Sequence, residues 1–213
     1  RGYADLMRHL EKFGVLVVSL QPVNVDEMKT YWQILGRLAG KEPEVQGMIR
    51  RLNNGVAAAR SVSGGIKAKK RVYFEAIHDR FKTFSPGAMA LFALDCAGGI
   101  NVATDAKAVR STNIAAYGKE RILSHADKID VYLAQQGVMN PVKASDIVNE
   151  PGFRVIKAVR EGNVCFVDET MVSRPTLRLL KGICRIGEIL YPEHFCPPVK
   201  KAITSGEPGG NGQ

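Results

Sequence analysis

Cationic and aromatic side chains crowd the loop inside VYFEAIHDRFKTFSPGAM, residues 72–89. The segment starts as a strand and ends at Ser-Pro, a common helix start, and between these signals stand His78, Asp79, Arg80, Phe81, Lys82 and Phe84. Phenylalanine rings can stack on a flat macrocycle or an aryl group, and the cations can meet carboxylates or phosphate. These residue types favour contact with a ligand. The alternative is that Phe84 packs beneath its own helix while the charges are solvated.

A second candidate for anion binding is Arg174, in SRPTLR. An arginine at the opening of a helix presents a fixed guanidinium beside exposed backbone N–H groups. Arg178, one turn deeper, is expected to be structural. The sequence has no nucleophile elbow, Gly-rich phosphate loop, HExxH motif or metal-spaced Cys/His set. The chain is therefore predicted to be no enzyme and to hold no metal site of its own.

Alternating strands and helices must position these side chains. Strands are predicted at about residues 70–76, 129–134 and 163–167, with helices between and after them. This alternation is typical of an α/β fold whose sheet is parallel-dominated and flanked by helices. Two consecutive helices, 24–42 and 43–62, interrupt the alternation as a connector between two lobes would.

The charge of the chain leaves several classes of partner open. Its 213 residues carry a formal net charge of +9, which can serve nucleic acid, an anionic membrane surface or an anionic small ligand. The tight basic cluster KAKKR (67–71) is interpreted as a solvated linker, and no nucleic-acid motif accompanies it. In an oxidising compartment Cys184 and Cys196 could form a disulfide, and the sequence leaves open whether they do.

Five motifs in a fixed order carry a resemblance to a known family. They are AGGINVA (97–103), GKERILSHADKIDVYLAQ (118–135), AVREGNVCFVD (158–168), SRPTLRLLKGI (173–183) and LYPEHF (190–195). Together they resemble the C-terminal lobe of periplasmic substrate-binding proteins of the cobalamin and ferric-siderophore ABC-importer type, over about residues 14–196. The resemblance implies two α/β lobes joined by one long helix, with a ligand held in the cleft between them.

The resemblance also implies a domain division. Residues 1–23 are expected to be a remnant of the N-terminal lobe, a helix at 3–13 followed by the strand VLVVSL (15–20) outside the main sheet. Residues 24–62 would be the bridging helix and the helix after it, 63–197 the C-terminal lobe, and 198–213 a disordered tail. Most of the N-terminal lobe is expected to be absent. The helix and strand of the remnant would then expose apolar surface and favour self-association.

Site residues follow from the same resemblance. In that family the loop holding His78, Arg80, Phe81 and Phe84 faces the cleft; Asn113 and Tyr117 border the cleft from the other side of the lobe, and Arg174 faces it. Helix capping or packing is the alternative for Asn113 and Tyr117. An axial metal contact by His78 competes with a hydrogen-bonding surface role.

Glu120 has a different expected role. A glutamate at the matching place in relatives docks on arginines of the membrane permease. The alternative is an ordinary first-turn glutamate favoured by the helix dipole.

These expectations combine into one function. The chain is predicted to be the solute-binding component of an ABC importer, without a cofactor, that delivers a metal chelate to the permease. Ferric siderophore, corrinoid, haem and simple chelated metal all remain open as ligands. The expected location is periplasmic or extracytoplasmic, with a possible lipid anchor in the precursor, and no nucleic-acid partner is expected. The alternative function is a basic module that binds nucleic acid or an anionic surface.

Overall fold

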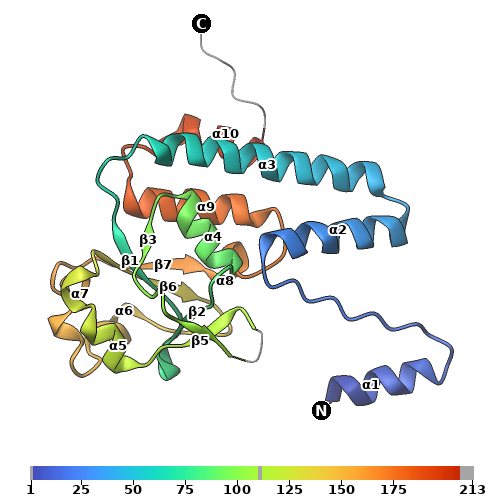
Figure 1. Ribbon diagram of the computed structural model, residues 1–213, viewed down its shortest axis with the longest axis horizontal. Coiled ribbons are helices and arrows are strands. Elements are labelled where there is room, and N and C mark those ends of the chain that lie inside the picture. The colour runs from blue at the N-terminus through green and yellow to red at the C-terminus, as the bar shows by residue number, and fades with distance from the viewer. Residues whose placement is uncertain (1, 110–111, 207–213) are drawn as a thin grey trace, which may run out of the picture.

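A computed structural model describes residues 2–109 and 112–206 of the chain. At its centre is a seven-stranded sheet in the order β4-β5-β2-β1-β6-β7, with β3 paired to the start of β1 (Figure 1). The strands are β1 (Arg71–Ile77), β2 (Lys82–Phe84), β3 (Ile100–Asn101), β4 (Lys107–Ala108), β5 (Ile114–Ala116), β6 (Val131–Gln136) and β7 (Val164–Asp168). The predicted α/β class is confirmed, and so are the three predicted strands.

The sheet is mixed and contains both parallel and antiparallel pairs. Strands β1, β6 and β7 run parallel, and β3 is parallel to β1. Strands β2, β5 and β4 are joined by antiparallel pairs. The parallel arrangement that the alternation predicted therefore holds for β1, β3, β6 and β7. It does not hold for β2, β5 and β4, because the short β2 folds straight back on β1.

The central strand β1 is buried on both faces, as expected for a parallel strand covered by helices. Val72 and Phe74 belong to one core, whereas Tyr73 points into the other. The first core lies under α2 (Val25–Ala39), α3 (Glu42–Gly64), α4 (Met89–Cys96), α8 (Glu169–Val172), α9 (Arg178–Leu190) and α10 (Pro197–Ser205). The second lies under α5 (Lys119–Ser124), η2 (Ala126–Lys128), α6 (Ala144–Val148), η3 (Phe153–Val155) and α7 (Lys157–Arg160).

The two consecutive helices form as predicted. Asn24 caps α2 by accepting a hydrogen bond from the Glu27 N–H at 2.8 Å, and the Glu27 side chain accepts one from the Val23 N–H. These two hydrogen bonds fix the start of the helix. Gly40 ends it in the left-handed region, at φ 63°. Trp32 anchors α2 to the body, since its indole Nε1 donates to the Pro175 carbonyl oxygen at 2.8 Å.

The predicted strand at residues 15–20 is wrong. Within the described residues this segment pairs with no strand, and it runs extended from α1 (Gly2–Glu11) to the start of α2 (Figure 1). Its side chains are largely exposed, Leu16 by 87%. A β-branched run becomes a strand only where a neighbouring strand accepts its backbone hydrogen bonds, and the sheet of this chain does not extend to it.

One further expectation needs correction. The predicted disordered tail begins too early, because Pro197–Ser205 form α10 and pack against α3; residues 207–213 lie outside the described residues. Residues 153–160 form two short pieces, η3 and α7, since Ile156 between them is extended. No helix among residues 2–109 and 112–206 is both long and apolar enough to cross a membrane.

Candidate functional site

Buried polar side chains concentrate where β1, β6 and β7 end. Parallel strands bring their carboxyl ends to one edge of a sheet, which is where ligands bind in open α/β folds. Glu75, His78, Gln135, Asn140 and Glu169 are all buried there. We call this edge of the sheet the polar edge. Buried polar groups are costly unless they are hydrogen-bonded, so the partners of these five side chains show how the edge is built.

His78 and Glu75 form the centre of one end of the polar edge. His78 Nδ1 lies 2.9 Å from Glu75 Oε2, and the Tyr132 hydroxyl donates to the same carboxylate oxygen. Burial by itself lowers the pKa of His78, but the hydrogen bond and charge of Glu75, with the charges of Glu150 and Asp79, outweigh it and raise that pKa. The other ring nitrogen, Nε2, lies 4.0 Å from Glu150 Oε2.

Phe81 lies beside this pair in a strained backbone conformation. It is the one non-glycine residue with positive φ in the described part of the chain, at 46°. Its ring centroid lies 6.1 Å from His78 and 6.0 Å from Phe153, and Lys119 Nζ sits 5.6 Å from the ring. Left-handed backbone is unfavourable for a bulky residue and tends to persist at functional sites. We call this group, His78, Phe81, Phe153, Lys119 and Glu150, the aromatic end.

The other end of the polar edge is a cavity of about 370 Å³ that we call the arginine end. Its polar lining includes Thr112, Asn113, Ser173 and Arg174, and the extended segment at residues 20–23 closes one side. Arg174 Nη2 lies 2.6 Å from Glu169 Oε1. Glu169 is buried whereas the arginine is half exposed, so the pair presents a fixed guanidinium to the cavity.

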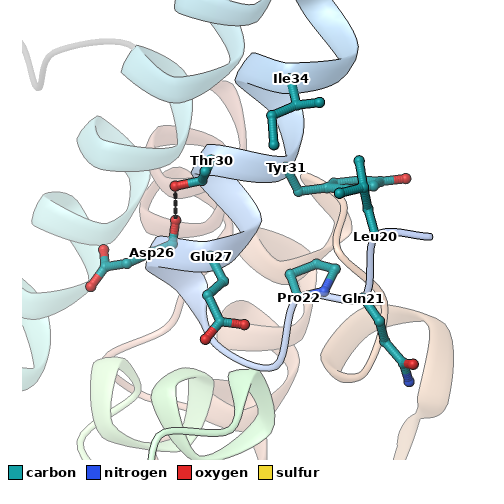
Figure 2. A pocket seen from close by; sticks show the side chains of 8 residues that line it. All are labelled: Leu20, Gln21, Pro22, Asp26, Glu27, Thr30, Tyr31 and Ile34. Carbon is teal, nitrogen blue, oxygen red and sulfur yellow. Dashed lines mark hydrogen bonds between the residues drawn. The ribbon is translucent and has the colours of Figure 1, made fainter. Parts of the chain in front are cut away.

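A second cavity of about 340 Å³ adjoins the arginine end (Figure 2). Both cavities are lined by Leu20, Gln21, Pro22 and Tyr31. Figure 2 shows the extended segment standing opposite one face of α2, with Asp26 and Glu27 at the base of that helix. These two carboxylates disfavour an anion there, so the guanidinium makes the first cavity the better anion receptor.

Across the described residues, no group of three or more His, Cys, Asp or Glu side chains could hold a metal ion.

Comparison with known proteins identifies the family. The model of the family described as "Periplasmic binding protein" matches residues 3–171, most of the chain. The chain belongs to the periplasmic binding protein family. Proteins of this family bind solutes and are not enzymes, which confirms that prediction. The search of curated proteins found no match.

Solved structures share the fold of this periplasmic binding protein. A possible iron-binding (periplasmic solute-binding) protein from Staphylococcus epidermidis is 20% identical, with a TM-score of 0.72, over 88% of this chain and 71% of that one. The periplasmic heme-binding protein RhuT from Roseiflexus is 17% identical, with a TM-score of 0.72, over 89% and 72%. S. aureus IsdE complexed with heme is 15% identical, with a TM-score of 0.68, over 88% and 73%. At these identities the likeness shows the fold.

The structure places four of the predicted ligand residues at the polar edge of the binding protein. His78 and Phe81 belong to the aromatic end, and Asn113 and Arg174 line the cavity of the arginine end. Arg80 is exposed in η1 (His78–Arg80) between His78 and Phe81.

The structure contradicts two of the predicted ligand contacts, those of the Phe84 and Tyr117 side chains. Phe84 is fully buried, with its ring centroid 4.8 Å from that of Phe74, so it packs beneath its helix. Tyr117 is also buried; its ring centroid lies 5.9 Å from that of Tyr73, and Arg121 covers it. Both rings lie on short strand or strand-end positions that face a core, which residue type alone does not reveal.

Glu120 is exposed in the first turn of α5. Its neighbour Lys119 turns inward to the aromatic end, where its Nζ lies 2.5 Å from Glu150 Oε1. Consecutive residues on a helix point in different directions, so Glu120 is directed away from that pair. This position suits both the docking role and the ordinary first-turn role.

Several residues of the polar edge were missed from the sequence. Lys119, Glu150 and Phe153 reach the aromatic end from segments 41 to 75 residues beyond His78, and no local pattern links them. Asn140 and Glu169 had an available signal: each follows the carboxyl end of a predicted strand, where α/β folds place binding residues.

Proposed function

We propose that this binding protein is the solute-binding component of an ABC importer and that it captures a metal chelate at the polar edge. The metal is cargo that arrives already chelated. The observation that carries the proposal is Phe81, whose left-handed backbone holds a half-buried ring at the carboxyl edge of the sheet. Backbone strain of this kind persists mainly at functional sites, which supports a binding role for the ring.

The two ends of the polar edge suit the two chemistries of a chelate. The Phe81 ring and the His78 imidazole can contact a flat or aryl part of the ligand. Arg174, with the Asn113 amide in the same cavity, can hold carboxylate, catecholate or other anionic oxygens. Ferric siderophores, corrinoids and haem all fit this description, and the solved neighbours titled iron-binding and heme-binding support the choice.

The remaining parts of the proposal concern the partner and the place of action. Glu120 would dock on the permease, residues 24–62 would bridge two lobes, and residues 63–197 would form the ligand-binding lobe. The protein would act outside the cytoplasm, with a lipid anchor on its precursor. A neighbour titled "ABC Transporter Substrate-Binding Protein" from Listeria monocytogenes, 18% identical with a TM-score of 0.71, supports the importer assignment.

A direct titration tests the proposal. The purified chain is titrated with haemin, cyanocobalamin, a ferric catecholate and a ferric hydroxamate, followed by absorbance and by fluorescence of Trp32, the single tryptophan. Because Trp32 donates to the carbonyl of Pro175, next to Arg174, binding at the arginine end should change its emission. Saturable binding of at least one chelate is expected, weakened by Phe81→Ala and Arg174→Ala. Salt-sensitive retention on a polyanion column without chelate binding would favour the nucleic-acid or anionic-surface alternative instead.

A further inference from the structure

A tight turn between the two ends of the polar edge carries two apolar side chains into solvent. Gly137 and Asn140 are joined by reciprocal backbone hydrogen bonds of 3.2 Å, so Val138 and Met139 occupy the tip. Val138 is 95% exposed and Met139 45% exposed. Turn tips normally carry glycine, asparagine, aspartate or serine, so two adjacent apolar residues there require an explanation.

The turn is held rigidly at its base. The Asn140 Nδ2 donates to the Gln135 carbonyl oxygen at 2.8 Å, and the Asn140 Oδ1 accepts from the His78 N–H at 2.9 Å. Gln136 reaches across and donates from Nε2 to the Val142 carbonyl oxygen at 2.8 Å. The tip is therefore fixed against the aromatic end by both backbone and side-chain bonds.

The same turn is tied to the arginine end. The Met139 N–H donates to Glu169 Oε2 at 3.0 Å, while the other oxygen of that carboxylate holds Arg174. Gly137 packs so closely on Glu169 that an added Cβ would lie 2.6 Å from its side chain. One buried carboxylate thus sets the position of the apolar tip relative to the guanidinium.

We infer that Val138 and Met139 form a preorganised apolar contact for the ligand, and that the ligand presents an apolar face between an aromatic-binding part and an anionic part. Holding such side chains in their bound position before binding lowers the entropy cost of binding. Methionine suits this role because its polarisable thioether packs well on π-systems. Chelates of the porphyrin or corrin class have such a face, whereas compact octahedral hydroxamate chelates lack a flat apolar face. This inference rests on the proposed function and narrows its ligand class.

The test uses the double variant Val138→Thr/Met139→Gln, which keeps side-chain size and leaves every backbone bond of the turn available. Ile100→Thr serves as the matched control, because Ile100 is 46% exposed at the opposite end of β1. Affinities for haemin, cyanocobalamin and a ferric hydroxamate are measured by absorbance titration, and thermal melting verifies folding.

The expected result is binding of haemin or cyanocobalamin that weakens about tenfold in the double variant and is unchanged in Ile100→Thr. Equal affinity of wild type and double variant would overturn the inference and leave the proposed function standing. Binding of the hydroxamate alone would overturn the inferred porphyrin or corrin ligand class, and the proposed function would again stand. Failure to bind any of these three chelates would overturn the inference, and failure to bind the ferric catecholate as well would overturn the proposed function.

Discussion

At the scale of single residues, the polar edge depends on two buried carboxylates. Glu75 is fully buried and is contacted by His78, Tyr132 and Asn140. Glu169 is held by Arg174 and by the Met139 N–H. A buried carboxylate that loses a partner retains its desolvation cost, so substitutions of these partners affect folding as well as binding.

The His78–Glu75 pair should make stability depend on pH. The pKa of His78 is raised in the folded protein, because the hydrogen bond and charge of Glu75 outweigh the opposing effect of burial. A raised pKa stabilises the fold fully below the unfolded pKa of about 6.5, and this contribution is lost as pH rises through the folded pKa. The free energy of unfolding, measured in urea, should therefore fall between roughly pH 6 and 8.

The variant His78→Gln should remove this part of the pH dependence, whereas His194→Gln, at a half-exposed site, should leave it in place. A wild-type stability that rises over the same pH range would contradict the assignment, as would an unchanged slope in His78→Gln.

At the scale of elements, local sequence signals predicted the features that depend on neighbouring residues, such as helix ends. The Asn24 cap, Glu27 and Gly40 fixed α2 because capping acts within a few residues. The start of α10 was missed, although the consecutive prolines at 197 and 198 fit the first turn of a helix. The strand at 15–20 failed for the opposite reason, since its existence depends on a partner that local sequence cannot supply.

Only part of the candidate site was predictable, because some of its residues are recognised by local sequence and others depend on distant partners. Loop residues His78 and Phe81 and the helix-opening Arg174 were recognised by type, and the structure brings them to one edge of the sheet. Their partners Glu150 and Glu169 are ordinary glutamates in sequence. Only the tertiary fold brings these glutamates to the polar edge and next to His78, Lys119 and Arg174.

The turn at residues 137–140 should be intolerant of a single methyl group. In Gly137→Ala, the new Cβ would lie 2.6 Å from both Cβ and Oε2 of Glu169, so that buried side chain must move and weaken its bonds to Arg174 and Met139. We expect a loss of about 1–3 kcal/mol in the free energy of unfolding, measured in urea.

The matched change Gly47→Ala should do the opposite. Gly47 lies inside α3, and the nearest atom to its added Cβ is 3.9 Å away, on the flexible Arg50 side chain. Alanine there should stabilise the protein by about 0.5–1 kcal/mol, because glycine costs more backbone entropy in a helix. Equal effects of the two changes would show that Gly137 is not closely packed.

At the scale of the whole molecule, the chain divides into a packed α/β body and an extended arm. The arm comprises α1 and residues 12–23, and α1 stands away from the sheet and its helices (Figure 1). The arm carries four exposed large apolar side chains, those of Phe13, Val15, Leu16 and Val18. Such a contiguous apolar strip with unpaired extended backbone favours pairing with another chain.

We therefore predict self-association of this chain through the arm. Light scattering after gel filtration should show a mass that rises with protein concentration, and Leu16→Lys/Val18→Lys should shift it toward the monomer. Val155→Lys, an exposed apolar site on the body, should have no such effect. A wild-type chain that stays monomeric at high concentration would contradict the prediction.

The last prediction separates ligand binding from permease docking, the two tasks of the proposed importer component. Glu120→Ala should leave chelate affinity nearly unchanged, because this exposed carboxylate lies on the outside of α5. Uptake by the assembled importer should fall, since an interfacial charge pair loses one partner.

Phe81→Ala should have the converse pattern. Losing the ring that packs against His78 and Phe153 should weaken chelate binding by about 1–3 kcal/mol, while docking of the ligand-free protein survives. Both variants are compared by absorbance titration and by uptake of the labelled chelate into proteoliposomes that hold the permease. If Glu120→Ala reduces chelate affinity as much as Phe81→Ala does, the two surfaces are not separate and the proposed division between them is wrong.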